Sequence, residues 1–191
     1  KEKISGVSYR PNPNITFQDL RYVKVKYYGY DGKIRSGQLL VNKSIAKDTV
    51  EIFQELYDMQ YPIESIRLID DYGADDTKSM EANNTSAFNY RIVEGTSHLS
   101  KHAYGRAIDI NPRVNPFVKR NSITPENGKI YAQRDVKKCK GKYKYNMIHR
   151  NDRVYRIFRK HRFQWGGDWI TYKDYQPVSY THLTLPTTSR V

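Results

Sequence analysis

Two strand-like segments joined by a tight turn constrain the fold of this chain more than any other feature of its sequence. Residues 22–28 and residues 34–41 alternate in polarity and are rich in β-branched and aromatic side chains. Asp31-Gly32 lies between the two segments, and glycine tolerates the positive φ that a short hairpin turn demands. The sequence therefore predicts an antiparallel β-hairpin over residues 22–41.

Two later segments change to a helical period. We expect helices over residues 44–57 and 151–161, a buried strand over 65–70, and a short helix with a loop over 75–84. The expected inward residues are Ile45, Val50, Phe53, Leu56 and Tyr57 in the first helix and Val154, Tyr155, Ile157 and Phe158 in the second. This order of elements predicts an α+β fold, a single domain with a mainly antiparallel sheet flanked by helices.

The chain is strongly basic, with 33 Lys and Arg against 20 Asp and Glu among 191 residues. This length suits one domain, and 13% aromatic residues is too many for a disordered polycation. No run of eighteen apolar residues exists, so no transmembrane segment is predicted. Cys139 is the only cysteine, which excludes an internal disulfide, and we expect it to be exposed in a solvated loop. The net charge of +13 suits nucleic acid, an anionic membrane or an acidic polymer such as bacterial cell wall.

The segment from Ser100 to Asp109, Ser-Lys-His-Ala-Tyr-Gly-Arg-Ala-Ile-Asp, contains the residues best suited to chemistry. A neutral imidazole and a carboxylate are competent zinc ligands, and a catalytic zinc usually takes three protein ligands and keeps one place for water. The segment predicts a loop that carries His102, a turn at Gly105, and a strand that brings Asp109 back toward the imidazole. For His102 alone, the alternative is an ordinary surface histidine at a loop–strand junction.

The full spacing Ser-x-His-x-x-Gly-x-Ala-x-Asp resembles the metal motif of the VanY-type zinc peptidases. This family comprises the D-alanyl-D-alanine carboxypeptidases and L-alanyl-D-glutamate endopeptidases of bacteria and their phages. All five fixed positions match, and further landmarks of the family follow in the expected order: Asp-Gly-Lys in the hairpin, Asn84–Arg91, Asp109–Pro112 and Phe163–Trp169. The resemblance covers roughly residues 17–176. It implies a hedgehog/DD-peptidase-like domain, Zn²⁺ as cofactor, and peptidoglycan stem peptides as substrate.

The resemblance also implies a role for individual residues. His102 and Asp109 would bind zinc, and Asp174 would act as general base while the zinc-bound water attacks the peptide carbonyl. Arg91 would stabilise the oxyanion or hold a substrate carboxylate, a task that suits a planar and permanently charged guanidinium. The alternative for Arg91 is one more surface cation. The residues expected to shape the cleft or support the ligands are Ser100, Trp165 and Asp168. His98, His149 and His161 are expected to be solvated or packing histidines.

The pattern breaks at position 177, where the family has its third ligand and this chain has Pro177. The following residues, Val178–Thr187, resemble the in-frame translation of a transposon-type sequencing adapter. We therefore predict an irregular N-terminal segment over 1–16, a peptidase domain over 17–176, and a non-native tail over 177–191. We expect the natural gene product to be an enzyme and this chain to be impaired. Whether His182, five residues past the vacant position, can replace the missing ligand stays open.

Two other classes of function compete with this interpretation. A non-catalytic module would bind peptidoglycan through the same cleft. A nucleic-acid-binding protein is suggested by the charge and by 17 Tyr, but no zinc-finger spacing, helix-turn-helix pattern or aromatic ribonucleoprotein motif supports it, so we expect no nucleic acid partner. We expect the charge to reflect adhesion to anionic cell-wall polymers together with a solvated helix face. We expect a monomer that acts at the cell wall, in the periplasm or outside the cell, or as a phage lysin. Because the chain begins at Lys1, a signal peptide or anchor upstream of it stays open, as does the choice of scissile bond.

Overall fold

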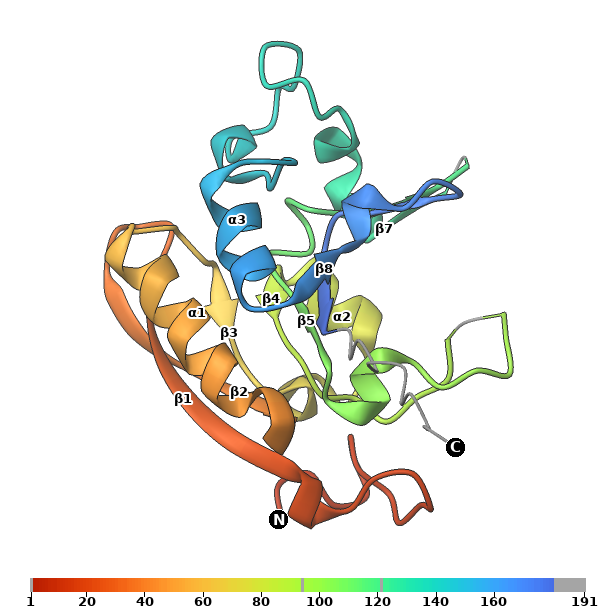
Figure 1. The fold of residues 1–191 in the computed structure, drawn as a ribbon. Helices are drawn as coiled ribbons and strands as arrows, with labels where there is room; N and C mark the ends of the chain where they lie inside the picture. Colours follow the sequence, from red (N-terminus) through yellow and green to blue (C-terminus); the bar gives the residue numbers. More distant parts are fainter. Residues whose placement is uncertain (1, 94, 121, 181–191) are drawn as a thin grey trace, which may run out of the picture.

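The predicted hairpin forms the left-hand side of the molecule in Figure 1. The computed structural model describes residues 2–93, 95–120 and 122–180. Strand β1 (Leu20–Tyr28) pairs antiparallel with β2 (Ile34–Asn42), from Leu20 opposite Asn42 to Tyr28 opposite Ile34. Gly32 has a φ of +74° in the connecting turn, as the Asp-Gly sequence predicts. The prediction of a hairpin is confirmed.

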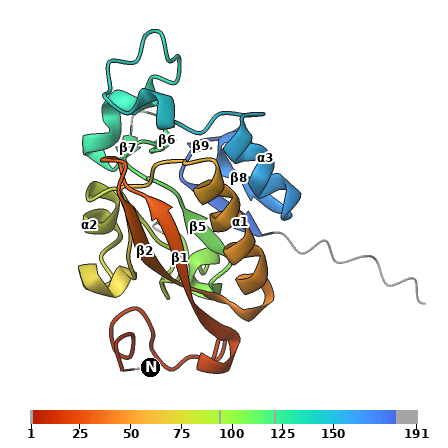
Figure 2. The same ribbon diagram turned by 90° about the vertical axis from the view of Figure 1, so that its left-hand side faces the viewer.

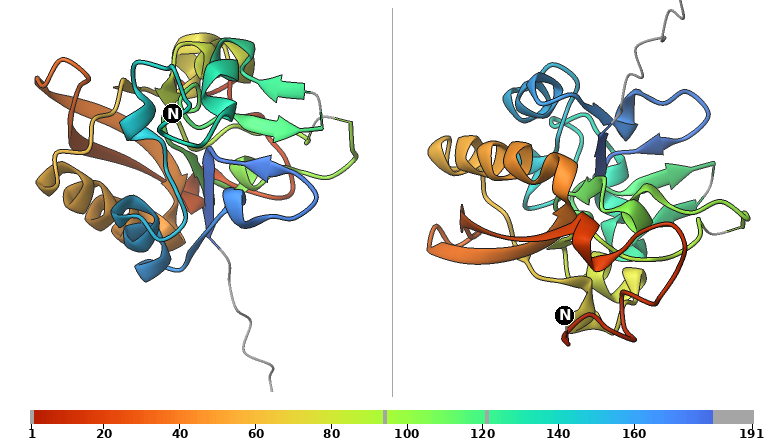
Figure 3. Two further views of the ribbon diagram at one scale, coloured as in Figure 1. Left: turned by 90° about the horizontal axis from the view of Figure 1, so that it is seen from above. Right: turned by 60° about the horizontal axis from the view of Figure 1, so that its bottom comes forward.

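Helix α1 (Ala46–Asp58) packs on this hairpin, and α1 lies between the hairpin and helix α3 (Arg153–Lys160) in Figure 3. The buried residues of α1 are Thr49, Ile52, Phe53 and Leu56. The prediction that Val50 points inward is wrong, because the buried stripe at positions 49, 52, 53 and 56 places Val50 beside it, with 45% of its surface exposed. For α3 the predicted inward face is confirmed, since Val154, Ile157 and Phe158 are buried.

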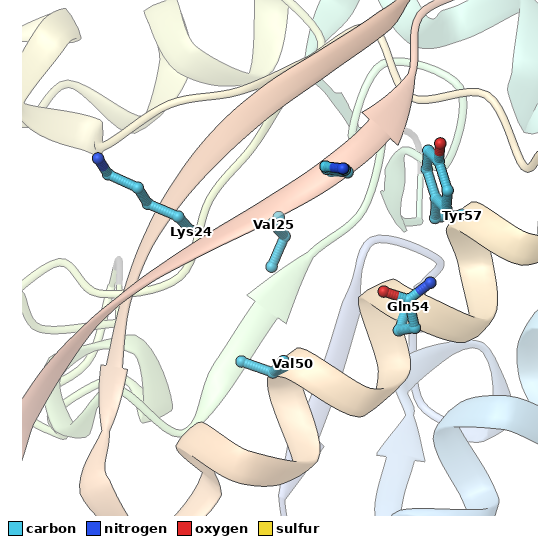
Figure 4. Close-up of a pocket in the computed structure, with 6 residues that line it drawn as sticks. Lys24, Val25, Val50, Gln54 and Tyr57 are labelled. Atoms are coloured by element: carbon cyan, nitrogen blue, oxygen red, sulfur yellow. The ribbon is translucent and has the colours of Figure 1, made fainter.

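A shallow hollow lies between β1 and the exposed edge of α1 (Figure 4). Val50 and Tyr57 of the helix line it together with Val25 of the strand, and the side chains of two lysines and a glutamine complete it. None of these side chains is a carboxylate, a histidine or a cysteine. The hollow therefore offers no side chain of the kinds that commonly bind metal ions in proteins.

The remaining strands are short and mostly antiparallel, so the α+β class is confirmed. One sheet has the order β5 (Ala107–Asp109), β10 (Pro177–Tyr180), β8 (Phe163–Trp165) and another the order β7 (Ser122–Thr124), β6 (Phe117–Lys119), β9 (Lys173–Asp174). Strands β3 (Ser65–Ile66) and β4 (Asn84–Thr85) pair in parallel, and helix α2 (Asp76–Glu81) lies between them in the chain. Figure 2 shows the hairpin in front, with α1 and α3 beside it and α2 on its other side. Within the described residues, no helix is long and apolar enough to cross a bilayer.

The predicted strand over residues 65–70 ends after two residues. Its pairing with β4 stops at Ile66 opposite Thr85, and the chain then turns so that Leu68 joins a core cluster with Ile4 and Phe88. A 3₁₀ helix from Ile69 to Tyr72 follows. The run of apolar residues therefore reports burial rather than an extended strand.

The main core lies between the hairpin, α1, α3 and the β5–β10–β8 sheet. A small third cluster consists of Val114, Tyr131, Cys139 and Met147. The expectation of an exposed cysteine is wrong, since Cys139 is only 2% exposed. The lysines that flank it point to solvent while the thiol packs on Tyr131 and Met147, so a basic sequence context does not report the exposure of the residue within it.

Strand β10 continues the fold beyond the predicted domain end at residue 176. It is the central strand of its sheet, paired with β5 on one side and β8 on the other. Pro177 is the first residue of the strand, a position at which strands tolerate proline. The prediction of a non-native tail over 177–191 concerns the origin of these residues and stays a prediction, and His182 lies outside the described residues.

Candidate active site

His102 lies in a short 3₁₀ turn, Lys101–Tyr104, that is closed at both ends by its neighbours. The Ser100 hydroxyl oxygen accepts a hydrogen bond of 3.2 Å from the backbone N–H of His102. Gly105 ends the turn with a φ of +63° and donates its N–H to the His102 carbonyl at 3.0 Å. A Cβ atom at Gly105 would lie 2.7 Å from the backbone nitrogen of Asn42, so the position requires glycine. The loop and turn predicted from the motif are present.

The imidazole of His102 is held between a carbonyl and a carboxylate. Its Nδ1 atom lies 2.5 Å from the Ala87 carbonyl oxygen, and its Nε2 atom lies 3.3 Å from Oδ1 of Asp109. Because a carbonyl can only accept, Nδ1 carries the proton and donates it to Ala87. Nε2 thus faces Asp109. Proteins commonly orient a metal-binding histidine in this way, with the N–H of the other ring nitrogen donated to a carbonyl. Burial lowers the pKa of His102, but the charge and hydrogen bond of Asp109 outweigh it, so the pKa is raised overall.

Asp109 is the last residue of β5 and is fixed from both sides. Its backbone N–H donates to the Ser86 carbonyl at 2.9 Å, and Pro177 of β10 lies opposite it in the sheet. The side chains of His102 and Asp109 are 11% and 15% exposed. The structure therefore brings together the two residues that the motif separates by seven positions.

Asp174 lies in β9, opposite Phe117 of β6. Part of the residue reaches solvent, but its Oδ1 atom is buried and has no hydrogen-bond partner within the described part of the chain. Burial raises the pKa of Asp174 to about 8, and the Asp109 carboxylate adds to the effect, while the Gln176 N–H, His102 and Arg91 act in the opposite direction. Asp174 is thus close enough to both expected ligands to interact with them electrostatically.

Arg91 forms an ion pair with Asp76 of α2. Its positive charge lowers the pKa of both His102 and Asp174, so it acts on the same site and is not an isolated surface cation. Arg91 lies near the site because the segment before it contacts the His102 turn twice. Ala87 accepts a hydrogen bond from the imidazole, and two residues later Asn89 donates its N–H to the His102 carbonyl at 3.2 Å. The Asn84–Arg91 landmark therefore runs alongside the His102 turn.

The other expected site residues support neighbouring loops. Trp165 in β8 is buried and donates its indole N–H to the Tyr175 carbonyl at 3.0 Å, which fixes the chain directly after Asp174. Asp168 accepts a hydrogen bond of 3.0 Å from Tyr155 of α3 and lies 3.5 Å from Arg150. The structure thus places Trp165 next to the site strand and directs Asp168 toward α3.

Two partners of this site were not predicted from the sequence. The Ala87 carbonyl orients His102, and Asp76 pairs with Arg91. A backbone carbonyl leaves no signature in residue identity. Asp76 was one of several acids in the polar stretch 75–84, with no feature that distinguished it.

The donor set fits a zinc ion but is one ligand short. Two ligands on a tetrahedral zinc, each about 2.0–2.1 Å from the metal, lie about 3.3–3.4 Å apart, which matches the 3.3 Å between His102 Nε2 and Asp109 Oδ1. The unpartnered Oδ1 of Asp174 is a further sign that a cation or a water belongs beside it. Proline has no side-chain atom that could bind a metal, so position 177 contributes no third ligand.

A separate cluster joins α1 to the end of α3. Asp48, Glu51 and His161 have potential ligand atoms within 4.8 Å of one another, and the described residues contain no other group of three that meets this limit. His161 is 7% exposed, and its Nδ1 and Nε2 atoms lie 3.1 Å from Asp48 and from Glu55, respectively. Because carboxylates occupy both nitrogens, this cluster fastens α3 to α1. His102, Asp109 and Asp174 do not meet the 4.8 Å limit together, so Asp174 lies farther from the other two than a third ligand of the same metal ion would.

A comparison with family models supports this site. Residues 94–180, a little under half of the chain, match a family described as D-alanyl-D-alanine carboxypeptidase. The matched range includes His102, Asp109 and Asp174 and ends with β10. No curated protein and no solved structure matches the chain. The family match supports the coarser form of the resemblance, a peptidase of the D-Ala-D-Ala carboxypeptidase-like kind that acts on peptidoglycan.

Proposed function

We propose that this chain carries the fold and part of the active site of a zinc-dependent peptidase that hydrolyses peptidoglycan stem peptides. The scissile bond would be D-Ala-D-Ala or L-Ala-D-Glu. The observation that supports this most directly is the His102–Asp109 pair, 3.3 Å apart, with the other imidazole nitrogen committed to the Ala87 carbonyl. Zinc, when bound by these two residues, supplies Lewis-acid chemistry that polarises a carbonyl and lowers the pKa of a water.

The remaining residues then have distinct tasks. Asp174 takes a proton from the attacking water and later delivers it to the departing amine, a task that suits a carboxyl group with a buried oxygen that has no other hydrogen-bond partner among the described residues. Arg91 binds a substrate carboxylate or the developing oxyanion, and its ion pair with Asp76 holds the guanidinium in place. Ser100 and Gly105 keep the His102 turn in one conformation.

We further propose that Pro177 impairs this chain. Residues directly opposite each other in an antiparallel pair point to the same face, with Cβ atoms about 4.5–5.5 Å apart, and position 177 is opposite Asp109. A ligating side chain at 177 would therefore stand beside the two ligands already present. Losing a supporting partner of a ligand costs about 10–100-fold in metal affinity, so losing a whole ligand costs at least that much.

The test compares the chain with Pro177→His. Zinc content after equilibrium dialysis and mass spectrometry of digested muropeptides are measured for both, and for Pro177→His combined with His102→Ala. We expect about 10-fold or more tighter zinc binding and new hydrolysis in Pro177→His, and loss of both in the double variant. Gln164→His, which adds an imidazole at an exposed position of the same sheet, is the matched control. Zinc that survives His102→Ala would come from elsewhere, such as the His161 cluster. Full activity of the unaltered chain would refute the impairment, and no cleavage by Pro177→His would refute the peptidase.

One observation favours a second candidate, a non-catalytic module that binds peptidoglycan through the same cleft: the third ligand position is proline. Asp174→Asn separates the two candidates, because a binding module keeps its affinity for muropeptides whereas an enzyme loses turnover. In both cases we propose that the protein acts as a monomer at the bacterial wall, from the periplasm, from outside the cell or as part of a phage lysin.

A further inference from the structure

The positive charge of this chain is concentrated in one segment. Residues 129–162 contain 13 Lys and Arg against two Asp, a net charge of +11 out of +13 for the whole chain. The other residues are thus nearly balanced. None of His102, Asp109, Asp174 and Arg91 belongs to this segment.

This segment, which we call the basic segment, forms the loop at the top of Figure 1 and continues into α3, and Figure 2 shows the loop at the top again. Its loop is held by Tyr131, Cys139 and Met147, which are buried together, and its helix by Val154, Ile157 and Phe158. Most of the cations between these anchors are exposed, whereas Arg134 points inward and donates to the Val114 and Ile148 carbonyls. The exposed cations are Lys129, Lys137, Lys138, Lys140, Lys142, Arg150, Arg153, Arg156, Arg159, Lys160 and Arg162.

Few of these cations are neutralised within the protein. In the described part of the chain, Lys138 pairs with Asp135, Arg150 with Asp168 and Lys160 with Glu55. The other eight exposed cations have no acidic partner among the described residues. Exposed ion pairs contribute little to stability, and the other cations have no acidic partner among the described residues, so the stability of the fold does not explain why so many cations lie in this segment.

We propose that the basic segment is an anchoring surface for a phosphodiester-linked polyanion of the bacterial wall, distinct from the hydrolytic site. This inference rests on the proposed function, which brings the protein to the wall. A high density of unpaired cations on an ordered segment suits a polymer with regularly repeated phosphates, whose binding releases counterions. Arg supplies planar donors for phosphate and Lys supplies point charges, and both are present.

The same observations favour a wall polymer over nucleic acid. Proteins that bind single strands stack successive bases on several exposed aromatic rings, whereas Tyr145, at 79%, is the only large aromatic of the basic segment among the markedly exposed hydrophobic residues. The exposed face of α3 carries Arg and Lys without Asn or Gln, the residues that read adenine. The surface therefore recognises charge without reading bases.

The experiment compares two variants of the full chain with equal net charge. The first removes five cations of the basic segment, and the second, its matched control, removes five exposed cations elsewhere. The first variant is Lys137→Gln, Lys140→Gln, Lys142→Gln, Arg153→Gln and Arg156→Gln. The control is Arg10→Gln, Lys24→Gln, Lys26→Gln, Lys33→Gln and Arg67→Gln. Binding is measured by co-sedimentation with purified walls that carry a polyol-phosphate polymer and with the same walls after acid removal of that polymer.

We expect the first variant to lose about tenfold or more in affinity for the polymer-bearing walls and to show a shallower salt dependence, and the control to change by about twofold or less. Removing the polymer should abolish the difference. Equal losses in both variants, or binding that survives removal of the polymer, would overturn the proposal. Tighter binding to DNA of matched charge than to the soluble polymer would replace it with a nucleic acid surface.

Hydrolysis of a soluble muropeptide separates this proposal from the peptidase. Measured in the Pro177→His background, it should be unchanged by the five substitutions, because a soluble substrate needs no anchor. If the peptidase proposal fails, cleavage is absent while polymer binding persists. If the anchor proposal fails, cleavage is present and the two variants bind walls equally.

Discussion

Replacing Asp174 by Asn should stabilise the metal-free chain at neutral pH, although it removes the proposed general base. The pKa of Asp174 rises from its ordinary value of 3.8 to about 8 on folding. Between these two values the folded chain holds a proton that the unfolded chain has released, so stability falls as the pH rises through this window and the loss is complete above it. Integrated from acid conditions to pH 7, the loss is about 4 kcal/mol.

An Asn side chain has the same shape and no charge, so it removes this penalty. It also brings an amide whose N–H groups need partners, at a cost of roughly 1–3 kcal/mol. At pH 7 the variant should therefore be more stable than the parent by about 1–3 kcal/mol. At pH 5 most of the penalty has gone, and the two should be about equal or the parent slightly favoured.

The assay is urea unfolding of chelator-treated protein at pH 5 and pH 7, with the exposed Asp58→Asn as control. The difference in unfolding free energy between Asp174→Asn and the parent should grow by about 3 kcal/mol from pH 5 to pH 7, whereas the control difference should stay constant. A pH-independent difference for Asp174→Asn would refute the argument that burial beside Asp109 holds this proton. In Pro177→His, added zinc should shrink the difference, since a nearby cation favours the ionised carboxylate.

Three further predictions concern the residues that build the site and fasten the helices. Gly105→Ala should cost roughly 2 kcal/mol or more in unfolding free energy, because it combines a positive φ with a clash, while Gly32→Ala in an open turn should cost about 1 kcal/mol. His161→Leu should cost about 2–4 kcal/mol by thermal unfolding, since it leaves the carboxylates of α1 without their buried partner; a cost below 1 kcal/mol would contradict the contact. In the Pro177→His background, Arg91→Lys should lower kcat/KM by about 10–100-fold with zinc content unchanged, and a loss of zinc instead would assign Arg91 a structural role.

Local patterns predicted the elements whose side chains alternate or recur over several turns. The hairpin is one such element, because Asp31-Gly32 determines its turn and the alternation determines which face is buried. Residues 65–70 failed because an apolar run is equally compatible with a strand or with a turn that is buried by a distant segment. Cys139 failed for the same reason: the lysines around it are local, whereas its packing against Tyr131 and Met147 depends on tertiary structure.

For the site, the motif spacing identified the two residues that meet and the loop that delivers one of them. The turn at Gly105 was also predicted from the motif. The structure gives the physical reason, because the positive φ of Gly105 and its close approach to Asn42 require glycine. The supporting contacts were not recognisable. Ala87 is 15 residues from His102 in the chain, and Asp76 is 15 residues from Arg91. Nothing in the sequence marks such pairs, because they become neighbours only when the segment around β4 lies beside β5.

The sheet around β10 depends on backbone pairing, whereas the proposed chemistry depends on the side chain at position 177. Backbone groups of residues 177–180 bridge two neighbouring strands, and such pairing makes few demands on side-chain identity. The sheet therefore forms with a proline at the position where we propose that a third, imidazole ligand belongs. On our proposal that residues 177–191 are non-native, a peptide of unrelated origin forms the middle of this sheet, and Pro177→His tests whether one substitution restores the proposed site.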